Sequence, residues 1–308
     1  MDTRPELGPG ERRTLGHFTS PAARARFATA YDAAFALLPR DHEGLDLDTS
    51  FGRVRAYRFG AGPGTPLVLL GGRNASTPMW AINLPLLAKD RPVFTLDGLG
   101  EAGGSTQTSP LTGPEDQARW VAEALGELGI GPVHLVGSSL GGWLALQVAI
   151  RRPPSVRSLT VLDPPATFAR LRAGFVAGGL LSTLPLTPEW ARHRLLRWIT
   201  GGPSDGAVGP EARLAMAALR GFRVRQPPPV LPTLEELRSV RTPVLALIAG
   251  RSRVHDARTA VARASTLPHG TVELWPDASH VVHGDFPQRF AERLEAFVMT
   301  VESSEVAS

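Results

Sequence analysis

The five residues Gly137-Ser138-Ser139-Leu140-Gly141 decide how the fold of this chain is interpreted. They follow the apolar, strand-like run 133–136 and precede residues 142–151, which have helical character. A serine between a strand and a helix, with a glycine two residues away on each side, is the arrangement of a nucleophile elbow. Such a tight turn exposes the serine hydroxyl and leaves no room for side chains at the two glycine positions. Ser139 is therefore the candidate nucleophile.

The pattern around this turn alternates between strands and helices. Apolar runs predict buried strands at 67–70, 93–96, 133–136, 159–162, 244–248 and 271–274, and helical stretches are expected at 114–128, 142–151, 258–266 and 287–301. An amphipathic helix at 21–38 and a pair of strands at 44–48 and 53–59 come before them. Short apolar strands separated by helices predict the α/β class, with a doubly wound, mostly parallel sheet.

The alternation breaks once, between residues 164 and 238. This stretch has helix-like pieces, the Gly/Pro-rich patch 201–203 and the proline run 227–229. We interpret it as a helical cap inserted over the carboxyl edge of the sheet. The predicted division is therefore a core of residues 1–163 and 239–308, with an N-terminal helical extension at about 20–38, and a cap of residues 164–238.

Polar residues follow several of the predicted strands. In a sheet of this kind, ligands bind beyond the carboxyl ends of the strands. Asp97, Asp163 and His280 stand at such positions, as does Ser139. A serine, an acid and a histidine in that chain order form the arrangement used for covalent acyl transfer.

The chain resembles the α/β-hydrolase family, in the branch that contains carboxylesterases and proline iminopeptidases. The motifs that carry the resemblance span residues 20–302: the 69–72 loop, the loop from Asp97 to Ser105, the 137–141 elbow, the 162–164 strand end, the 243–250 strand, and Ser279-His280 followed by Asp285 and Pro287. The resemblance implies a cofactor-free serine hydrolase that cleaves carboxylic esters. It implies His280 as the catalytic base and the backbone N–H groups of Arg73 and Leu140 as the oxyanion donors.

The sequence departs from the family pattern at the position of the acid. The family normally carries it three residues after the glycine that ends the seventh strand, where this chain has Arg253. An arginine cannot accept the hydrogen bond of the histidine. Asp163, at the end of the sixth strand, is the preferred substitute because a strand end fixes geometry better than a loop, and Asp256 is the second choice. The substitution at 253 also leaves open a non-hydrolytic or acyl-transfer role in natural-product tailoring, or a binding protein that retains only the fold.

Two rival interpretations concern other residues. His283 competes with His280 as the base, but it lies three residues further from the last strand. The same two histidines could also suggest a metal site, but no acid or cysteine lies at the spacing that zinc motifs require. The segment 98–103 matches G-x-G-x-x-G and raises a distant alternative, a dinucleotide-binding enzyme. Residues 104–110 are unsuited to open the helix that would hold a pyrophosphate.

Composition narrows the class of protein. The 308 residues are 43% hydrophobic, with a net charge of +4 and no cysteine. The low aromatic content, 6%, and the lack of a dense basic run argue against nucleic-acid binding. No apolar run reaches the roughly 20 residues of a membrane span. We expect a cytoplasmic protein without metal, acting on a small molecule with an apolar acyl or ester group.

Overall fold

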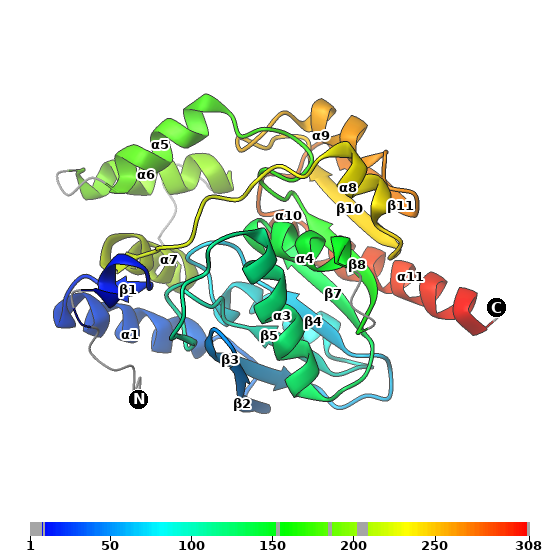
Figure 1. Ribbon diagram of the computed structural model, residues 1–308, viewed down its shortest axis with the longest axis horizontal. Coiled ribbons are helices and arrows are strands. Elements are labelled where there is room, and N and C mark those ends of the chain that lie inside the picture. The colour runs from blue at the N-terminus through cyan, green and yellow to red at the C-terminus, as the bar shows by residue number, and fades with distance from the viewer. Residues whose placement is uncertain (1–7, 9, 152–154, 184–186, 202–208, 307–308) are drawn as a thin grey trace.

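A twisted sheet forms the centre of the molecule. The computed structural model describes residues 8, 10–151, 155–183, 187–201 and 209–306 (Figure 1). The large sheet has nine strands in the order β11-β10-β8-β7-β4-β5-β3-β2, with β6 paired to β3. The pairs from β11 to β5 are parallel, and those that involve β3 are antiparallel. The predicted α/β class with a mostly parallel sheet is confirmed.

All the predicted strands are present, and several are longer than the apolar runs that predicted them. The strands of this sheet are β2 (His42–Thr49), β3 (Gly52–Phe59), β4 (Leu67–Leu70), β5 (Val93–Leu96), β6 (Thr106–Gln107), β7 (Val133–Ser138), β8 (Val156–Leu162), β10 (Val244–Ala249) and β11 (Gly270–Trp275). The extra length comes from polar and small residues, such as Gly137 and Ser138, which hydrophobicity alone does not assign to a strand.

Helices cover both faces of the sheet, as expected for a doubly wound fold. One apolar core lies under α3 (Pro114–Leu128), α4 (Leu140–Ile150), α8 (Leu234–Ser239) and α9 (Ala257–Ala264). The other core lies under α2 (Leu84–Leu87), α10 (Val282–Asp285) and α11 (Pro287–Val306). Central strands are buried on both faces, which explains their nearly continuous apolar sequences.

The segment predicted as a cap is mostly helical where it is described. It contains α5 (Ala173–Thr183), α6 (Glu189–Thr200) and α7 (Pro210–Gly221), followed by the short strand β9 (Phe222–Arg223). Part of the Gly/Pro-rich patch at 201–203 lies outside the described residues. The last helix of the predicted segment, α8, packs into a core cluster of the sheet through the fully buried Leu237.

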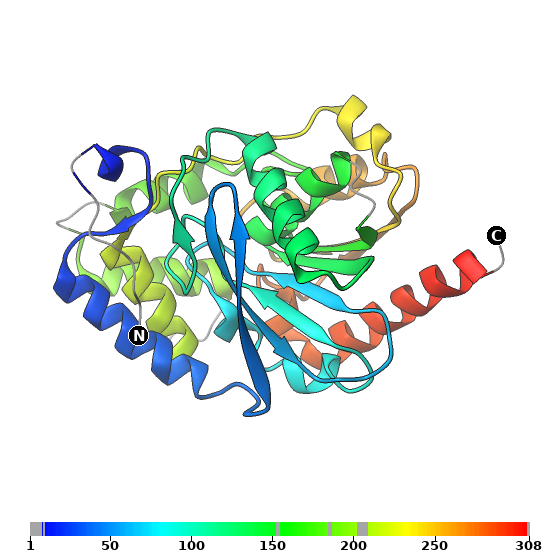
Figure 2. The same ribbon diagram turned by 60° about the horizontal axis from the view of Figure 1, so that its bottom comes forward.

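The N-terminal extension packs against this inserted segment. Helix α1 (Pro21–Phe35) lies beside α7 (Figure 2), and β1 (His17–Phe18) pairs with β9 in a separate two-stranded sheet. A third apolar cluster, which includes Phe27, Leu214 and Phe222, joins the two segments. Helix α1 ends three residues before the predicted end at 38, because residues 36–38 turn and bring Leu38 into the core under α2.

The order of the strands also places the site. After β4 the chain continues to β5 on one side, and after the neighbouring strand β7 it continues to β8 on the other side, so the strand order reverses between β4 and β7. A crevice opens at such a switch point beyond the carboxyl ends of the strands. The loops that leave β4 and β7 there carry Gly72 and Ser139, and a Cβ built on Gly72 would lie 3.2 Å from the Cβ of Ser139.

Candidate active site

Ser139 occupies the strained turn that the sequence predicts. Its backbone dihedrals are φ 53° and ψ −123°, a region that residues other than glycine rarely adopt. A Cβ on Gly137 would lie 2.2 Å from the carbonyl oxygen of Gly141, and a Cβ on Gly141 would lie 2.2 Å from that of Leu70. Both glycines are therefore required by space. Helix α4 begins directly at Leu140, two residues earlier than predicted, so Ser139 stands at its N-terminus.

Ser139, His280 and Asp163 form a continuous hydrogen-bonded chain. The Nε2 atom of His280 lies 2.8 Å from Oγ of Ser139, and its Nδ1 lies 2.6 Å from Oδ2 of Asp163. His280 is 8% exposed and Asp163 is fully buried, whereas Ser139 is partly open to solvent. With Nδ1 donating to the carboxylate, Nε2 is free to accept the proton of the serine hydroxyl.

The carboxylate of Asp163 accepts hydrogen bonds from four groups. Besides His280, these are the hydroxyl of Ser252 at 2.7 Å, Nε2 of His255 at 2.9 Å and the backbone N–H of Ala249 at 3.1 Å. Burial opposes ionisation of Asp163, but the hydrogen bonds from His255 and His280 outweigh it and hold the pKa of this carboxyl well below its usual range. Asp163 is thus a stable anion beside the imidazole.

Asp256 lies apart from this chain of hydrogen bonds. It is the N-cap of α9, where its carboxylate accepts from the backbone N–H and the hydroxyl of Thr259, both at 2.8 Å. This exposed carboxylate also pairs with Arg172 at 3.6 Å. The N-capping bonds account for the carboxylate of Asp256, and the structure places only the first choice, Asp163, against His280.

Arg253 points to other partners. Its guanidinium lies 6.0 Å from the ring centroid of Trp198 on α6. The residues on either side of it, Ser252 and Val254, are buried, and the Ser252 hydroxyl faces Asp163. The loop that normally carries the acid in the family therefore supplies donors to Asp163 instead.

The two N–H groups that the sequence suggests as oxyanion donors are left without a partner among the described residues. Within the described chain, neither the amide of Arg73 nor that of Leu140 donates to a protein acceptor. The amide of Leu140 also stands in the first turn of α4, where negative charge is stabilised.

Glu101 holds the loop that carries Arg73. One carboxylate oxygen accepts the backbone N–H of Asn74 at 2.7 Å, and the other lies 3.1 Å from the Arg73 guanidinium. Asn74 itself has a positive φ of 58°. Glu101 is 6% exposed, so this ion pair fixes the loop from a nearly buried position.

The segment 98–103 that matches G-x-G-x-x-G has a structural role. It leads to strand β6 and not into a helix, so it lacks the helix N-terminus of a dinucleotide site. Asp97, just before it, accepts from the backbone N–H of Thr77 at 2.8 Å, from that of Gly104 at 2.6 Å and from the hydroxyl of Tyr31 at 2.9 Å. These bonds tie the loops after β4 and β5 to helix α1.

Two contacts fix the loop that carries His280. The backbone N–H of Ser279 donates to Asp285 at 2.6 Å, and its hydroxyl donates to the carbonyl of Thr200 at 2.7 Å. Thr200 is the last residue of α6, so the inserted segment touches the residue next to the histidine.

His283 is a buried structural residue. Its Nδ1 lies 2.9 Å from Oδ1 of Asn83, and Asn83 donates back to the backbone carbonyl of His283 at 3.0 Å. Burial and then the nearby His280 lower the pKa of His283 to about 3. It is therefore neutral at ordinary pH and does not contact Ser139.

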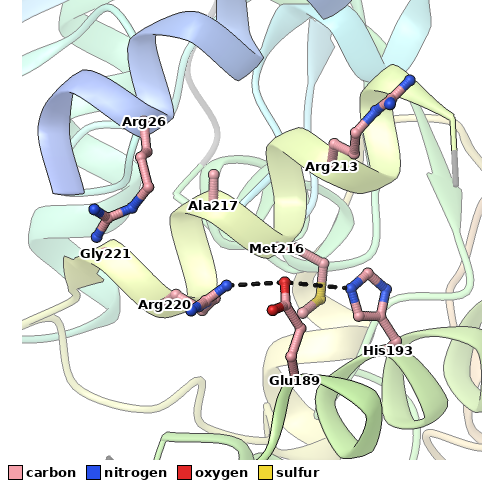
Figure 3. A pocket seen from close by; sticks show the side chains of 8 residues that line it. All are labelled: Arg26, Glu189, His193, Arg213, Met216, Ala217, Arg220 and Gly221. Carbon is pink, nitrogen blue, oxygen red and sulfur yellow. Dashed lines mark hydrogen bonds and ion pairs between the residues drawn. The ribbon is translucent and has the colours of Figure 1, made fainter. Parts of the chain in front are cut away.

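A cavity of about 300 Å³ lies elsewhere, between α1, α6 and α7 (Figure 3). Glu189 pairs there with Arg220 and His193. Neither Ser139 nor His280 lines it, and the figure shows Arg26 and Arg213 pointing in different directions. The cavity is separate from the hydrogen-bonded chain at Ser139, and we assign it no role in the chemistry.

The sequence did not reveal His255, Ser252 or Glu101. Each acts through a contact across separate loops, and a lone histidine or serine carries no spacing signal.

Among the described residues, no three His, Asp or Glu side chains gather as they would around a metal ion, and no helix has the length and apolar character to cross a bilayer.

Comparisons with known proteins identify the family of the chain. A model described as "Alpha/beta hydrolase family" matches residues 67–293. The chain is 27% identical over 281 residues to an uncharacterized carboxylesterase, nap, of Bacillus subtilis, covering 88% of this chain and 92% of that protein. It is 26% identical over 294 residues to carboxylesterase YbfK of the same organism, covering 91% and 96%.

Solved structures extend the similarity to the whole fold. The crystal structure of the carboxylesterase CesB (YbfK) from Bacillus subtilis superimposes with a TM-score of 0.82 at 25% identity, covering 90% of this chain and 98% of that one. The crystal structure of naproxen esterase from Bacillus subtilis gives a TM-score of 0.81 at 26% identity, covering 95% and 99%.

Proposed function

This chain belongs to the alpha/beta hydrolase family, and we propose on that premise that it is a serine hydrolase that cleaves carboxylic esters. The observation that carries the proposal is the pair of distances on His280, 2.8 Å to Ser139 and 2.6 Å to Asp163. The names of the similar carboxylesterases support the same reaction.

In the proposed mechanism, Oγ of Ser139 attacks the ester carbonyl while Nε2 of His280 takes its proton. Asp163 stabilises the imidazolium that forms and keeps the ring in the correct tautomer. The N–H groups of Arg73 and Leu140 bind the oxyanion, and His280 returns the proton to the leaving alcohol. Water, activated by His280, then hydrolyses the acyl-enzyme and frees Ser139.

The division into core and cap is part of the proposal. We assign residues 164–238 to a cap that restricts water access to Ser139, since water exclusion strengthens the oxyanion interactions. The bond from Ser279 to Thr200 supports this, because it places the end of α6 next to the histidine loop. The last helix of this segment, α8, packs on the core, so we assign the covering role to the part of the segment before residue 234.

We propose a small-molecule ester with an apolar acyl group as the substrate and the cytoplasm as the location. No observation favours acyl transfer over hydrolysis. Acyl transfer was suggested by Arg253, which stands where the family normally has its acid. In this proposal Asp163, which contacts His280, takes the role of that acid.

A series of p-nitrophenyl esters with graded acyl length tests the function. Wild type should hydrolyse them, and a fluorophosphonate should label Ser139 in a one-to-one ratio. The Ser139→Ala variant should lose labelling and roughly 10⁴- to 10⁶-fold in kcat, as loss of a catalytic nucleophile does. Ester turnover by pure Ser139→Ala at the wild-type rate would refute the proposal.

A further inference from the structure

His255 holds the oxygen of Asp163 that does not face His280. Its Nε2 lies 2.9 Å from Oδ1, while Oδ2 lies 2.6 Å from the imidazole of His280. An ionised carboxylate only accepts hydrogen bonds, so His255 presents Nε2–H to Asp163. The two histidines therefore hold the same carboxylate, one on each oxygen.

The second nitrogen of His255 fixes the tautomer. Nδ1 is buried and has no hydrogen-bond partner in the described chain, and the side chain is fully buried. A proton on Nδ1 would be buried without an acceptor, which is costly. The geometry thus favours a ring with its proton on Nε2 alone, directed at Asp163.

The backbone of His255 is fixed as well. His255 forms an isolated antiparallel bridge with Leu171, and the N–H of Arg172 donates to the carbonyl of Val254 at 2.8 Å. These contacts come from the chain that leads into α5. The start of the inserted segment therefore fixes the backbone of the loop after β10 at His255.

We propose that His255 is a positioning residue, which donates to Oδ1 of Asp163 and so orients Oδ2 toward His280. The inference rests on the proposed function and deepens it. The loop after β10 does not supply the acid in this chain; through Ser252 and His255 it holds an acid that comes from the neighbouring strand β8.

A matched pair of amide variants tests this role. The terminal nitrogen of Gln has the same place along its side chain as Nε2 of His, whereas that of Asn is one carbon shorter. His255→Gln should keep the bond and stay within about threefold of the wild-type kcat. His255→Asn should lose about 10- to 100-fold in kcat with KM nearly unchanged, because small misplacements of catalytic groups cost that much.

The pH profile separates positioning from packing. Without the bond from His255, Asp163 is less well oriented toward His280 and stabilises its imidazolium less, so the acid limb of kcat/KM should move to lower pH in His255→Asn and not in His255→Gln. Other titratable and charged groups around these histidines are the same in both variants: His283 on α10, Asp285 at the loop of His280, Arg253 and Asp256 in the loop of His255, and Arg172, which pairs with Asp256.

Several outcomes would overturn the inference. His255 only fills space if both variants lose kcat equally, if this loss matches the decrease in the fraction of enzyme that a fluorophosphonate labels, and if the acid limb of kcat/KM does not move. If His255→Asn does not fold, ¹⁵N-histidine NMR of wild type decides: we expect a proton on Nε2 of His255, and a proton on Nδ1 alone would contradict the proposal. Wild type that neither labels nor cleaves esters would instead refute the proposed function.

Discussion

Oδ2 of Asp163 lies 2.6 Å from Nδ1 of His280, although the two residues follow strands that are not neighbours in the sheet. Asp163 ends β8 and His280 follows β11, and β10 lies between these strands in the sheet. The carboxylate passes over the end of β10, where the N–H of Ala249 and the hydroxyl of Ser252 donate to it. A carboxylate on β8 can therefore reach a histidine that follows β11.

Gly72→Ala tests how closely the loop after β4 approaches the nucleophile. The added methyl would lie 3.2 Å from Cβ and 3.6 Å from Oγ of Ser139, so it should displace the serine or the substrate. We expect a fall in kcat/KM of about 10- to 100-fold, since misplacement by 1 Å costs that much. Gly126→Ala, on α3, is the control, because nothing lies within 4 Å of the added methyl there. Equal activity of the two variants would contradict the assigned geometry.

Glu101→Ala tests the support of the oxyanion loop. The change removes the acceptor of the Asn74 N–H and the partner of Arg73. We expect kcat to fall by about 10- to 100-fold, somewhat less than the full loss of an oxyanion donor. Glu101→Gln keeps an acceptor for the Asn74 N–H and should fall between wild type and Glu101→Ala. Steady-state kinetics measures both, and an unchanged kcat in Glu101→Ala would show that the loop needs no such anchor.

His283 gives the protein a specific sensitivity to acid. Its pKa is lowered to about 3 in the folded state, below the value near 6.5 of an unfolded chain. A histidine with a depressed pKa takes up its proton only on unfolding, so stability falls as the pH drops from 6.5 toward 3. Between pH 6 and 4 this residue should contribute a loss of about 1.4 kcal/mol per pH unit.

Urea unfolding at several pH values checks this linkage. Between pH 6 and 4, the unfolding free energy of His283→Gln should decrease less than that of wild type. The difference in slope should correspond to about one proton fewer taken up on unfolding. The comparison uses the change with pH, so a constant loss of stability in the variant cancels. Identical slopes for the two proteins would mean that His283 is protonated in the folded state.

The sequence predicted those parts of the fold and site that local sterics and periodicity determine. Gly137 and Gly141 reveal the elbow because their neighbours leave no space for Cβ atoms, and the apolar runs reveal the central strands. The choice of Asp163 over Asp256 followed from the rigidity of a strand end.

Other features depend on contacts between distant segments. The packing of α1 on α7 joins residues about 190 positions apart, and no local pattern indicates it. His255 and Glu101 likewise become informative only when the loops after β10, β8, β4 and β5 are seen together. The N-capping role of Asp256 had a local signal, an aspartate just before the predicted helix at 258–266.

The most direct test compares Asp163→Asn with Asp256→Asn on one p-nitrophenyl ester. The amide at 163 supplies no negative charge and can stabilise the wrong tautomer of His280, so kcat/KM should fall by roughly 10⁴-fold while the fold is retained. Asp256→Asn should keep nearly full activity, because an asparagine also serves as an N-cap. Full activity of Asp163→Asn together with loss in Asp256→Asn would contradict the account.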